Sequence, residues 1–414
     1  MEWINIIIPI ITAILLTLCI LKRQKKEVAA DPEKAKKYSY KNFFILYWLV
    51  PILSSVCLIA IIAMVMRAND NSDTEYLSYY FTKICYEEPW NERVKSNKLN
   101  TATEEEKRKM RISERNQDYL YETVKHPAKW YGVTNSNKTI DIGKKEYERI
   151  KALWNTPEVF INKNRVYDTL DGNAYEHSWD NQDSTMVCWS ETHQYQNKTL
   201  NSESAFSFRE YTPEEKTKLG LYDYPEINNG VLNPIVGYSK YVSQADIDTL
   251  RYFNSKYGYS NQIQTLLLIF PNTAAAIAEE QRAYWQGGNK NEFVTCVGID
   301  STNNKVQWVK CFSWMDNSTL EVQCRNTLMK DSTLNIQNYY KILSDNLSLW
   351  KRKEFKDFDY ISTNIDSDGQ LAIFLTILIW NLILGGVCAR FILVVYQFPM
   401  KKTRKRRKAK TIKE

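Results

Sequence analysis

The chain has 414 residues and a formal net charge of +7 at pH 7. Its mean hydropathy of −0.46 is typical of a soluble protein, but that average conceals three apolar runs, at residues 3–21, 43–66 and 371–398. At about 1.5 Å per helical residue, each run can cross a hydrocarbon core about 30 Å thick. Buried helices of soluble proteins are usually shorter and amphipathic. The composition therefore excludes a purely soluble protein, and the sequence predicts three transmembrane helices.

Lys and Arg are concentrated in two segments beside these runs, residues 22–42 and the polybasic tail 399–414. Basic segments next to a span stay on the cytoplasmic side, so both are predicted to be cytoplasmic. The N-terminus and residues 67–370 then lie outside the cytoplasm. The net charge is therefore a topology signal. We expect membrane lipids among the partners, because the tail attracts anionic lipid, but no nucleic acid.

The first apolar run, within residues 1–21, has no basic residue before it and no small-residue cleavage site after it. We therefore expect a retained anchor rather than a cleaved signal peptide, in a multi-pass protein of the plasma (inner) membrane. The composition is rich in Asn and Lys, which favours a bacterial protein. Four sequons in the middle section then form polar loops rather than glycosylation sites: Asn137, Asn197, Asn317 and Asn346.

The third run contains Asn381 and Arg390. They indicate either an intramembrane site or helix–helix contact, or a span that ends near Ala389 with Arg390 reaching the interface. Three spans with so few polar residues offer a transporter no pathway unless the chain oligomerises.

Cysteines do not form a recognisable framework. Five of the eight lie in the middle section, where an odd number cannot all pair within one chain, and no CxxC motif occurs. Cys296 and Cys311 fall on a predicted hairpin, where a suitable register would place them on the same face and allow them to pair.

Residues 67–233 are predicted to form a helical and β-rich extension. Residues 67–82 read as a polar juncture, and 101–125 as an exposed helix that begins with a capping box of Thr103 and Glu106. A second helix is predicted at 142–155, with Tyr147, Ile150 and Leu153 or Trp154 on its apolar face. Short aromatic and β-branched runs then predict strands at 159–167, 174–179, 185–189 and 205–211. Their aromatic rings either fill a core or form an exposed ligand platform.

Residues 234–361 have a more regular pattern. The elements predicted are helices at 243–257, 273–285 and 334–350 and strands at 262–270, 292–300, 305–313 and 320–325. The strand at 262–270 is almost entirely apolar, as expected of a central strand. This order predicts an α/β sandwich with a mixed sheet, so that the whole chain is of the α+β or α/β class with three transmembrane helices.

Three segments resemble the TPM-domain family. Residues 237–270, GYSKYVSQADIDTLRYFNSKYGYSNQIQTLLLIF, resemble its opening helix and first strand. Residues 278–300, AEEQRAYWQGGNKNEFVTCVGID, resemble its next helix, glycine loop and core strand, and residues 305–314, KVQWVKCFSW, the strand after the hairpin. The resemblance, over 234–361, implies a small α/β domain tethered outside a membrane. It also implies either phosphatase-like activity or the assembly of membrane complexes.

The loop at 285–292 is the predicted ligand-binding site. Paired glycines let the backbone turn tightly and expose N–H groups, and the polar residues that follow add donors, so the loop suits an anion or a peptide carboxylate. The alternative is a structural turn in which the glycines supply positive φ and the Asn residues cap the helix end. The candidate residues are Trp285, Gly287, Gly288, Asn289, Lys290, Asn291 and Glu292.

Motifs of catalysis and metal binding are missing from the sequence. His126, His177 and His193, with Cys188 between the last two, have spacings that match no standard ligand set. There is no G-x-S-x-G, H-E-x-x-H or P-loop motif.

We therefore expect a binding or assembly module that contacts a protein or envelope component and needs no cofactor. The alternative is a hydrolase or phosphatase that uses a divalent metal outside the cytoplasm. Acidic residues converging beside Gly287 and Gly288 would favour the enzyme, and an aromatic or apolar patch the binding module.

Overall fold

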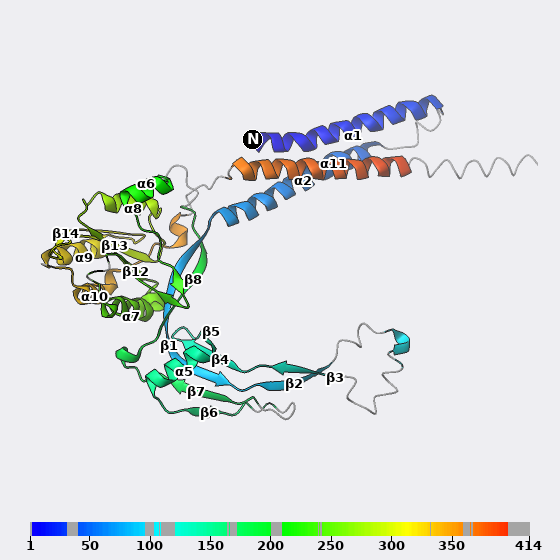
Figure 1. Cartoon of the computed structure of the whole chain (residues 1–414). Coiled ribbons are helices and arrows are strands. Elements are labelled where there is room, and N and C mark those ends of the chain that lie inside the picture. The colour runs from blue at the N-terminus through cyan, green and yellow to red at the C-terminus, as the bar shows by residue number, and fades with distance from the viewer. Residues whose placement is uncertain are drawn as a thin grey trace, which may run out of the picture. The chain divides into compact units, whose positions relative to one another are not determined.

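The computed structural model describes residues 2–30, 40–95, 103–106, 108, 121–163, 165, 172–199, 209–238, 240, 242–331, 333–358, 365 and 367–395. The chain divides into two compact units (Figure 1). Unit 1 comprises Met1–Asp73, Gln196–Ser207 and Phe355–Glu414, and unit 2 comprises Thr74–Tyr195 and Phe208–Glu354.

Unit 1 is built on three helices that pack against one another, α1 (Glu2–Ala30), α2 (Tyr40–Asp70) and α11 (Ser367–Val395). Among the described residues, two helical stretches are long and apolar enough to cross a membrane, Trp48–Asn69 and Asp368–Cys388. The apolar stretch of α1 is shorter, at Ile7–Cys19. A span in α1, and the orientation of all three helices, therefore stay predictions.

Polar side chains join these helices. Asn381 of α11 is 2% exposed, and its Nδ2 donates a hydrogen bond to Ser55 Oγ of α2 at 2.9 Å. Trp48 Nε1 of α2 donates to Thr17 Oγ1 of α1 at 3.1 Å. Asn381 is thus a helix–helix contact, one of the two roles expected of a polar residue within an apolar helix.

The first sheet of unit 2 has the strand order β5-β4-β1-β7-β6 among the described residues, and β8 also pairs with β1. Its strands are β1 (Ser72–Glu87), β4 (Lys129–Thr134), β5 (Thr139–Asp141), β6 (Val159–Ile161), β7 (Ala174–Ser178) and β8 (Cys188–Gln196). Helix α5 (Gly143–Trp154) confirms the helix predicted at 142–155. It buries Tyr147, Ile150 and Trp154 against the sheet, whereas Leu153 is exposed.

The polar juncture predicted at 67–82 is wrong, because most of it belongs to the long strand β1. Two of its polar side chains, Glu75 and Ser78, are buried and paired rather than solvated. Glu75 lies 3.3 Å from His193 and 3.4 Å from Arg352, and Ser78 Oγ donates to Gln264 Oε1 at 2.8 Å. Polarity therefore does not mark exposure in this strand.

The helix predicted at 101–125 is wrong at its end, where Tyr121–His126 forms β3 and pairs with β2 (Trp90–Lys95). At its start, the predicted capping box is present, since Thr103 N donates to Glu106 Oε2 at 2.8 Å. Most of the segment between lies outside the described residues, as does most of the strand predicted at 205–211. Helix α6 (Pro213–Leu219), which begins with a capping box at Thr212, was not predicted.

The second sheet of unit 2 has the order β11-β12-β13-β14 among the described residues. Its strands are β11 (Ile235–Gly237), β12 (Gln264–Pro271), β13 (Glu292–Ile299) and β14 (Val306–Ser313). The first two pairings are parallel and the third is antiparallel, so the sheet is mixed, as predicted. Strands β12 and β13 are buried along almost their whole length.

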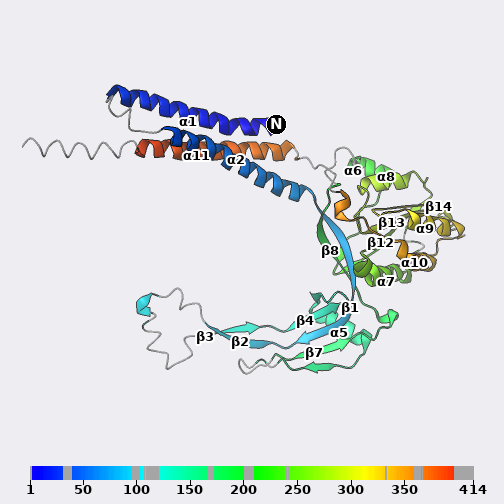
Figure 2. The same cartoon turned by 180° about the vertical axis from the view of Figure 1, so that it is seen from behind.

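Helices cover both faces of this sheet, as Figures 1 and 2 show. They are α7 (Gln244–Asn261), α8 (Ile277–Tyr284), α9 (Thr319–Lys330) and α10 (Ile336–Asp345). Leu267 and Ile269 face the core beneath α7, α9 and α10, and Leu266 and Leu268 face the core beneath α8. This alternation follows from the two-residue period of a strand.

The strand predicted at 320–325 is wrong, because these residues lie in α9. Leu320, Cys324 and Leu328 are each 0% exposed and recur every four residues, which is the spacing of one helix face. The Cys296–Cys311 pairing is also wrong. Thr295, not Cys296, lies opposite Cys311 in the β13–β14 ladder, so the two thiols point to opposite faces of the sheet.

Candidate functional site

The predicted loop at 285–292 connects α8 to β13. Gln286, Gly287 and Gly288 have φ of +50°, +85° and +78°. A Cβ at Gly288 would lie 3.1 Å from the Glu292 carboxylate. The paired glycines are therefore required by the turn itself, as the structural alternative supposed.

The polar side chains of this loop are buried rather than displayed. Asn289 is 7% exposed, Lys290 1%, and Asn291 and Glu292 0%. The Glu292 carboxylate accepts hydrogen bonds from Asn289 N at 2.9 Å, from Asn289 Nδ2 at 2.8 Å and from Tyr224 OH at 3.1 Å. The backbone N–H of Asn289 is thus taken by a carboxylate of the same chain, and a binding role for the loop stays a prediction.

The loop also joins the two sheets of unit 2. Tyr195 OH of β8 donates to Asn289 Oδ1 at 3.1 Å, and Asn291 Nδ2 donates to the carbonyl of Tyr76 in β1 at 2.6 Å. The ammonium of Lys290 lies 5.6 Å from the ring centroid of Tyr195, within cation–π range. These contacts give the predicted site residues a structural role at the junction between the sheets.

An open groove of about 690 Å³ lies on the first sheet, next to this junction. Three aromatic rings line it, from Tyr76, Trp189 and Tyr224, together with the carboxylates of Glu191 and Glu226. Its size falls within the range of about 300–1,000 Å³ that is usual for ligand sites. This groove is the candidate functional site.

Tyr224 of the groove contacts the predicted loop and in turn holds Tyr76. Tyr224 stacks on Trp285 with ring centroids 4.0 Å apart and an interplanar angle of 15°. Tyr76 meets Tyr224 edge-on at 6.1 Å, and its OH donates to the carbonyl of Pro225 at 2.6 Å. With the Tyr224–Glu292 hydrogen bond, these contacts fix the positions of the Tyr76 and Tyr224 rings, so this part of the groove is preformed.

The groove is acidic. Glu226 is exposed and forms no ion pair with a described residue, whereas Glu191 pairs with Lys138. Burial, followed by the charges of Glu292 and Glu226, raises the pKa of Tyr76. At neutral pH the Tyr76 phenol is therefore neutral, and the groove presents aromatic rings beside negative charge.

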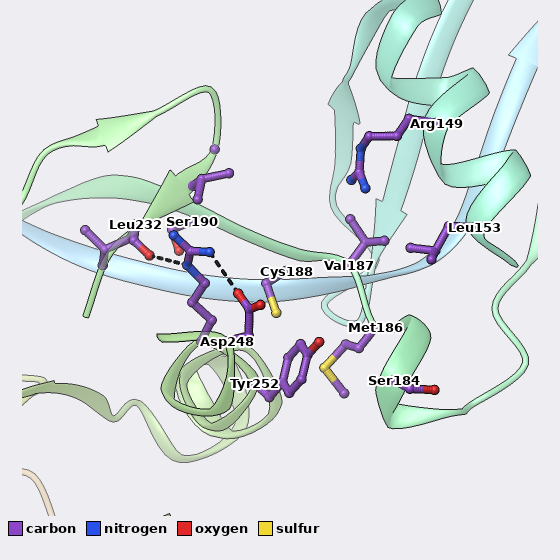
Figure 3. A pocket seen from close by; sticks show the side chains of 13 residues that line it. Arg149, Leu153, Ser184, Met186, Val187, Cys188, Ser190, Leu232, Asp248 and Tyr252 are labelled. Carbon is purple, nitrogen blue, oxygen red and sulfur yellow. Dashed lines mark hydrogen bonds and ion pairs between the residues drawn. The ribbon is translucent and has the colours of Figure 1, made fainter. Parts of the chain in front are cut away.

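A smaller cavity of about 250 Å³ lies between α5, α7 and the start of β8 (Figure 3). Its two arginines are already paired, Arg251 with Asp248 at 3.0 Å and Arg149 with Glu146 at 2.6 Å. Figure 3 shows the Cys188 side chain close to Asp248 and Tyr252. Burial raises the pKa of Cys188 to about 12, so the thiol is a poor nucleophile at neutral pH. This cavity is smaller and its charges are balanced, so the open groove is the better candidate.

The three histidines do not converge. Each contacts a different glutamate: His126 with Glu92 at 3.0 Å, His177 with Glu158 at 3.2 Å and His193 with Glu75 at 3.3 Å. Among the described residues, no group of three or more His, Cys, Asp or Glu side chains is placed to hold a metal ion.

The residues of the groove were missed because they are far apart in the sequence. Tyr76 lies in a segment read as a juncture, Trp189 at the end of a predicted strand, and Tyr224 in an unassigned stretch. The one available signal was the abundance of aromatic residues, with 27 Tyr and 12 Trp in the chain. It suggested an aromatic platform but could not show which rings meet.

No family model matches the chain, and neither does any curated protein or solved structure. The resemblance to the TPM-domain family therefore stays a prediction, and the function has to be argued from the groove.

Proposed function

We propose that the chain is a membrane-anchored module whose unit 2 binds, outside the cytoplasm, a protein or envelope component that presents a positively charged group. The observation that carries this proposal is the preformed groove with three aromatic rings beside Glu226. An ammonium or guanidinium group is attracted to the face of an aromatic ring by about 0.5–2 kcal/mol, depending on desolvation. A carboxylate beside the rings adds a charge-assisted hydrogen bond.

The proposed membrane anchor is supported by two helices that are long and apolar enough to cross a membrane. The proposed orientation is supported by the basic segments 22–42 and 399–414. The resemblance to membrane-tethered TPM domains supports the same arrangement. The polybasic tail would contact anionic lipid on the cytoplasmic side.

The hydrolase alternative is less well supported. It requires carboxylates that converge beside Gly287 and Gly288 and are free to hold a divalent metal. The carboxylate of Glu292 is at this loop, but its oxygens accept three hydrogen bonds from Asn289 and Tyr224. Such a carboxylate is already satisfied, so we favour the binding module.

Binding is tested with the full-length protein in mild detergent and a fluorescent oligolysine peptide as the cationic probe. Glu226→Gln removes one exposed charge from the groove, and we expect it to weaken binding about 3- to 10-fold, as a lost contact of about 1 kcal/mol does. Glu214→Gln, an exposed glutamate of α6 outside the groove, is the matched control and should leave Kd unchanged. Equal affinity of the wild type and Glu226→Gln would refute the proposed site.

Orientation is tested separately in intact cells with a membrane-impermeant maleimide. Labelling above that of the wild type, which has its own cysteines, is expected before lysis for Glu214→Cys in unit 2, but only after lysis for Thr411→Cys in the tail. The reverse pattern would place unit 2 in the cytoplasm.

A further inference from the structure

Two thiols meet where helix α9 packs on strand β14. Thr295 Oγ1 lies 3.6 Å from Cys311 Sγ in β14 and 3.9 Å from Cys324 Sγ in α9. Both sulfur atoms therefore lie within 4 Å of the same hydroxyl oxygen. The described cysteines are free thiols, and these two lie on separate elements and contact the same threonine hydroxyl.

The surroundings hold this pair in place. Tyr339 is 0% exposed, and its OH donates to Thr295 Oγ1 at 2.9 Å and lies 2.8 Å from Thr265 Oγ1. At the start of α9, Ser313 Oγ donates to Glu321 Oε1 at 2.8 Å. The Ser313–Glu321 hydrogen bond attaches α9 to β14, and the Tyr339 hydrogen bonds hold Thr295, which contacts both thiols.

The two cysteines differ in access. Cys324 is fully buried, whereas Cys311 is partly exposed. An external oxidant can therefore reach the sulfur of Cys311, and Cys324 can act only on a bond that already involves Cys311. This is the arrangement of an attacking thiol and a resolving thiol.

We propose that Cys311 and Cys324 form a reversible disulfide that joins α9 to β14. The oxidant is an external disulfide, either glutathione disulfide or the active-site disulfide of a thiol oxidoreductase. The Cys311 thiolate attacks one sulfur of that disulfide, its S–S bond breaks, and one thiol leaves. Cys324 then loses its proton and attacks the Cys311 sulfur, so the mixed disulfide breaks and the second thiol leaves. Two electrons and two protons pass from the cysteine pair to the oxidant.

The bond would change the stability of α9. It closes a short loop between β14 and α9 and restricts the unfolding of that helix. Formation in the cell rests on the proposed placement of unit 2 outside the cytoplasm, where disulfides persist. The hydrogen bond to Cys311 and burial raise the pKa of Cys324. The thiolate is the nucleophile, so the bond should form faster as the pH rises.

The test uses the purified full-length protein in mild detergent, incubated with glutathione disulfide, unfolded, alkylated and digested for mass spectrometry. We expect two of the eight thiols to be lost and a Cys311–Cys324 cross-linked peptide to appear. Cys311→Ser should abolish it, and Cys296→Ser, the matched control on the opposite face, should leave it unchanged. Cys311→Ser is the main variant because the partly exposed site tolerates the change, and its melting temperature checks its folding. Full alkylation of both cysteines, or a cross-link of Cys311 to another cysteine, would overturn the proposal.

The same digest of acid-quenched cells shows whether the bond forms in the cell, where a reduced pair would overturn its physiological role. This outcome is separable from the proposed function. Loss of oligolysine binding in Glu226→Gln leaves the cross-link unaffected, and loss of the cross-link in Cys311→Ser leaves the groove intact.

Discussion

The two sheets of unit 2 differ in how completely their side chains are covered by helices. In the second sheet, β12 and β13 carry aliphatic side chains on both faces, and helices cover each face. In the first sheet, α5 covers part of one face and the strands are rich in aromatic rings. The second sheet is therefore a scaffold, while the first keeps side chains partly exposed and carries most of the groove.

The aromatic rings of the first sheet form a regular row across its strands. Four rings lie side by side in register across β4, β1, β7 and β6, and their centroids are 5.4, 5.9 and 5.6 Å apart: Trp130, Tyr86, Tyr175 and Phe160. Phe160, at the edge strand, is 56% exposed. Cross-strand aromatic pairs stabilise a sheet without full burial, so this sheet can be stable and still display rings.

The largest expected effect contrasts the two sheets directly. Leu267 in β12 is 0% exposed, and Leu267→Ala should destabilise unit 2 by about 3 kcal/mol or more through lost packing and a cavity. Phe160→Ala at the edge of the first sheet should cost less than about 1 kcal/mol. Thermal unfolding of the full-length variants in detergent measures both. Equal losses would remove the distinction between scaffold and display surface.

A smaller effect is expected at the junction between the sheets. Tyr224→Phe removes one of the hydrogen bonds to the buried Glu292 carboxylate and should cost about 1–3 kcal/mol. The control is Tyr211→Phe, because Tyr211 OH donates to Glu280, which lies at the surface. If both variants have the same melting temperature, the stability of the junction does not depend on the Tyr224–Glu292 hydrogen bond.

The next largest loss of stability is expected at helix α7, which packs on the second sheet. Ser243 caps it, accepting a hydrogen bond from Asp246 N, whereas α5 of the first sheet has no side-chain cap. Ser243→Ala should cost about 1 kcal/mol, and Ser243→Asn should retain most of the stability. If both substitutions lower the melting temperature equally, the loss of stability in Ser243→Ala does not come from the missing cap.

The same contrast explains what the sequence predicts well. The apolar run at 262–270 matches β12, and Ser243 with Asp246 marks the start of α7, because burial on both faces and capping leave local patterns. The sequence fails at β1, where buried Glu75 and Ser78 are satisfied by partners more than a hundred residues away. It also fails at α9, where Val322 and other strand-favouring residues obscured the four-residue spacing of its buried face.

At the candidate site too, local features could be predicted from the sequence and long-range contacts could not. The glycines of the loop at 285–292 were found because a tight turn needs them, but the burial of Lys290 and Glu292 depends on Tyr195 and Tyr224, which the local sequence does not place nearby. The groove itself depends on long-range packing, and no local pattern brings Tyr76 to Tyr224.

The smallest expected effect is a pH dependence in the first sheet. The hydrogen bond from Lys151, and to a lesser degree His177, lowers the pKa of Glu158 below its ordinary value of 4.5. A carboxyl group whose folded pKa is lowered adds stability above its unfolded pKa, and that stability is lost as the pH falls below about 4.5. The group is largely exposed, so the change should be small, below about 2 °C in melting temperature. We expect the difference between the wild type and Glu158→Gln to be present at pH 7, to shrink at pH 3.5 and to be reduced by high salt. Glu210→Gln, at an exposed position without an ion pair to a described residue, is the control. A difference that persists at pH 3.5 would indicate that Glu158 acts through packing against His177 rather than through its charge.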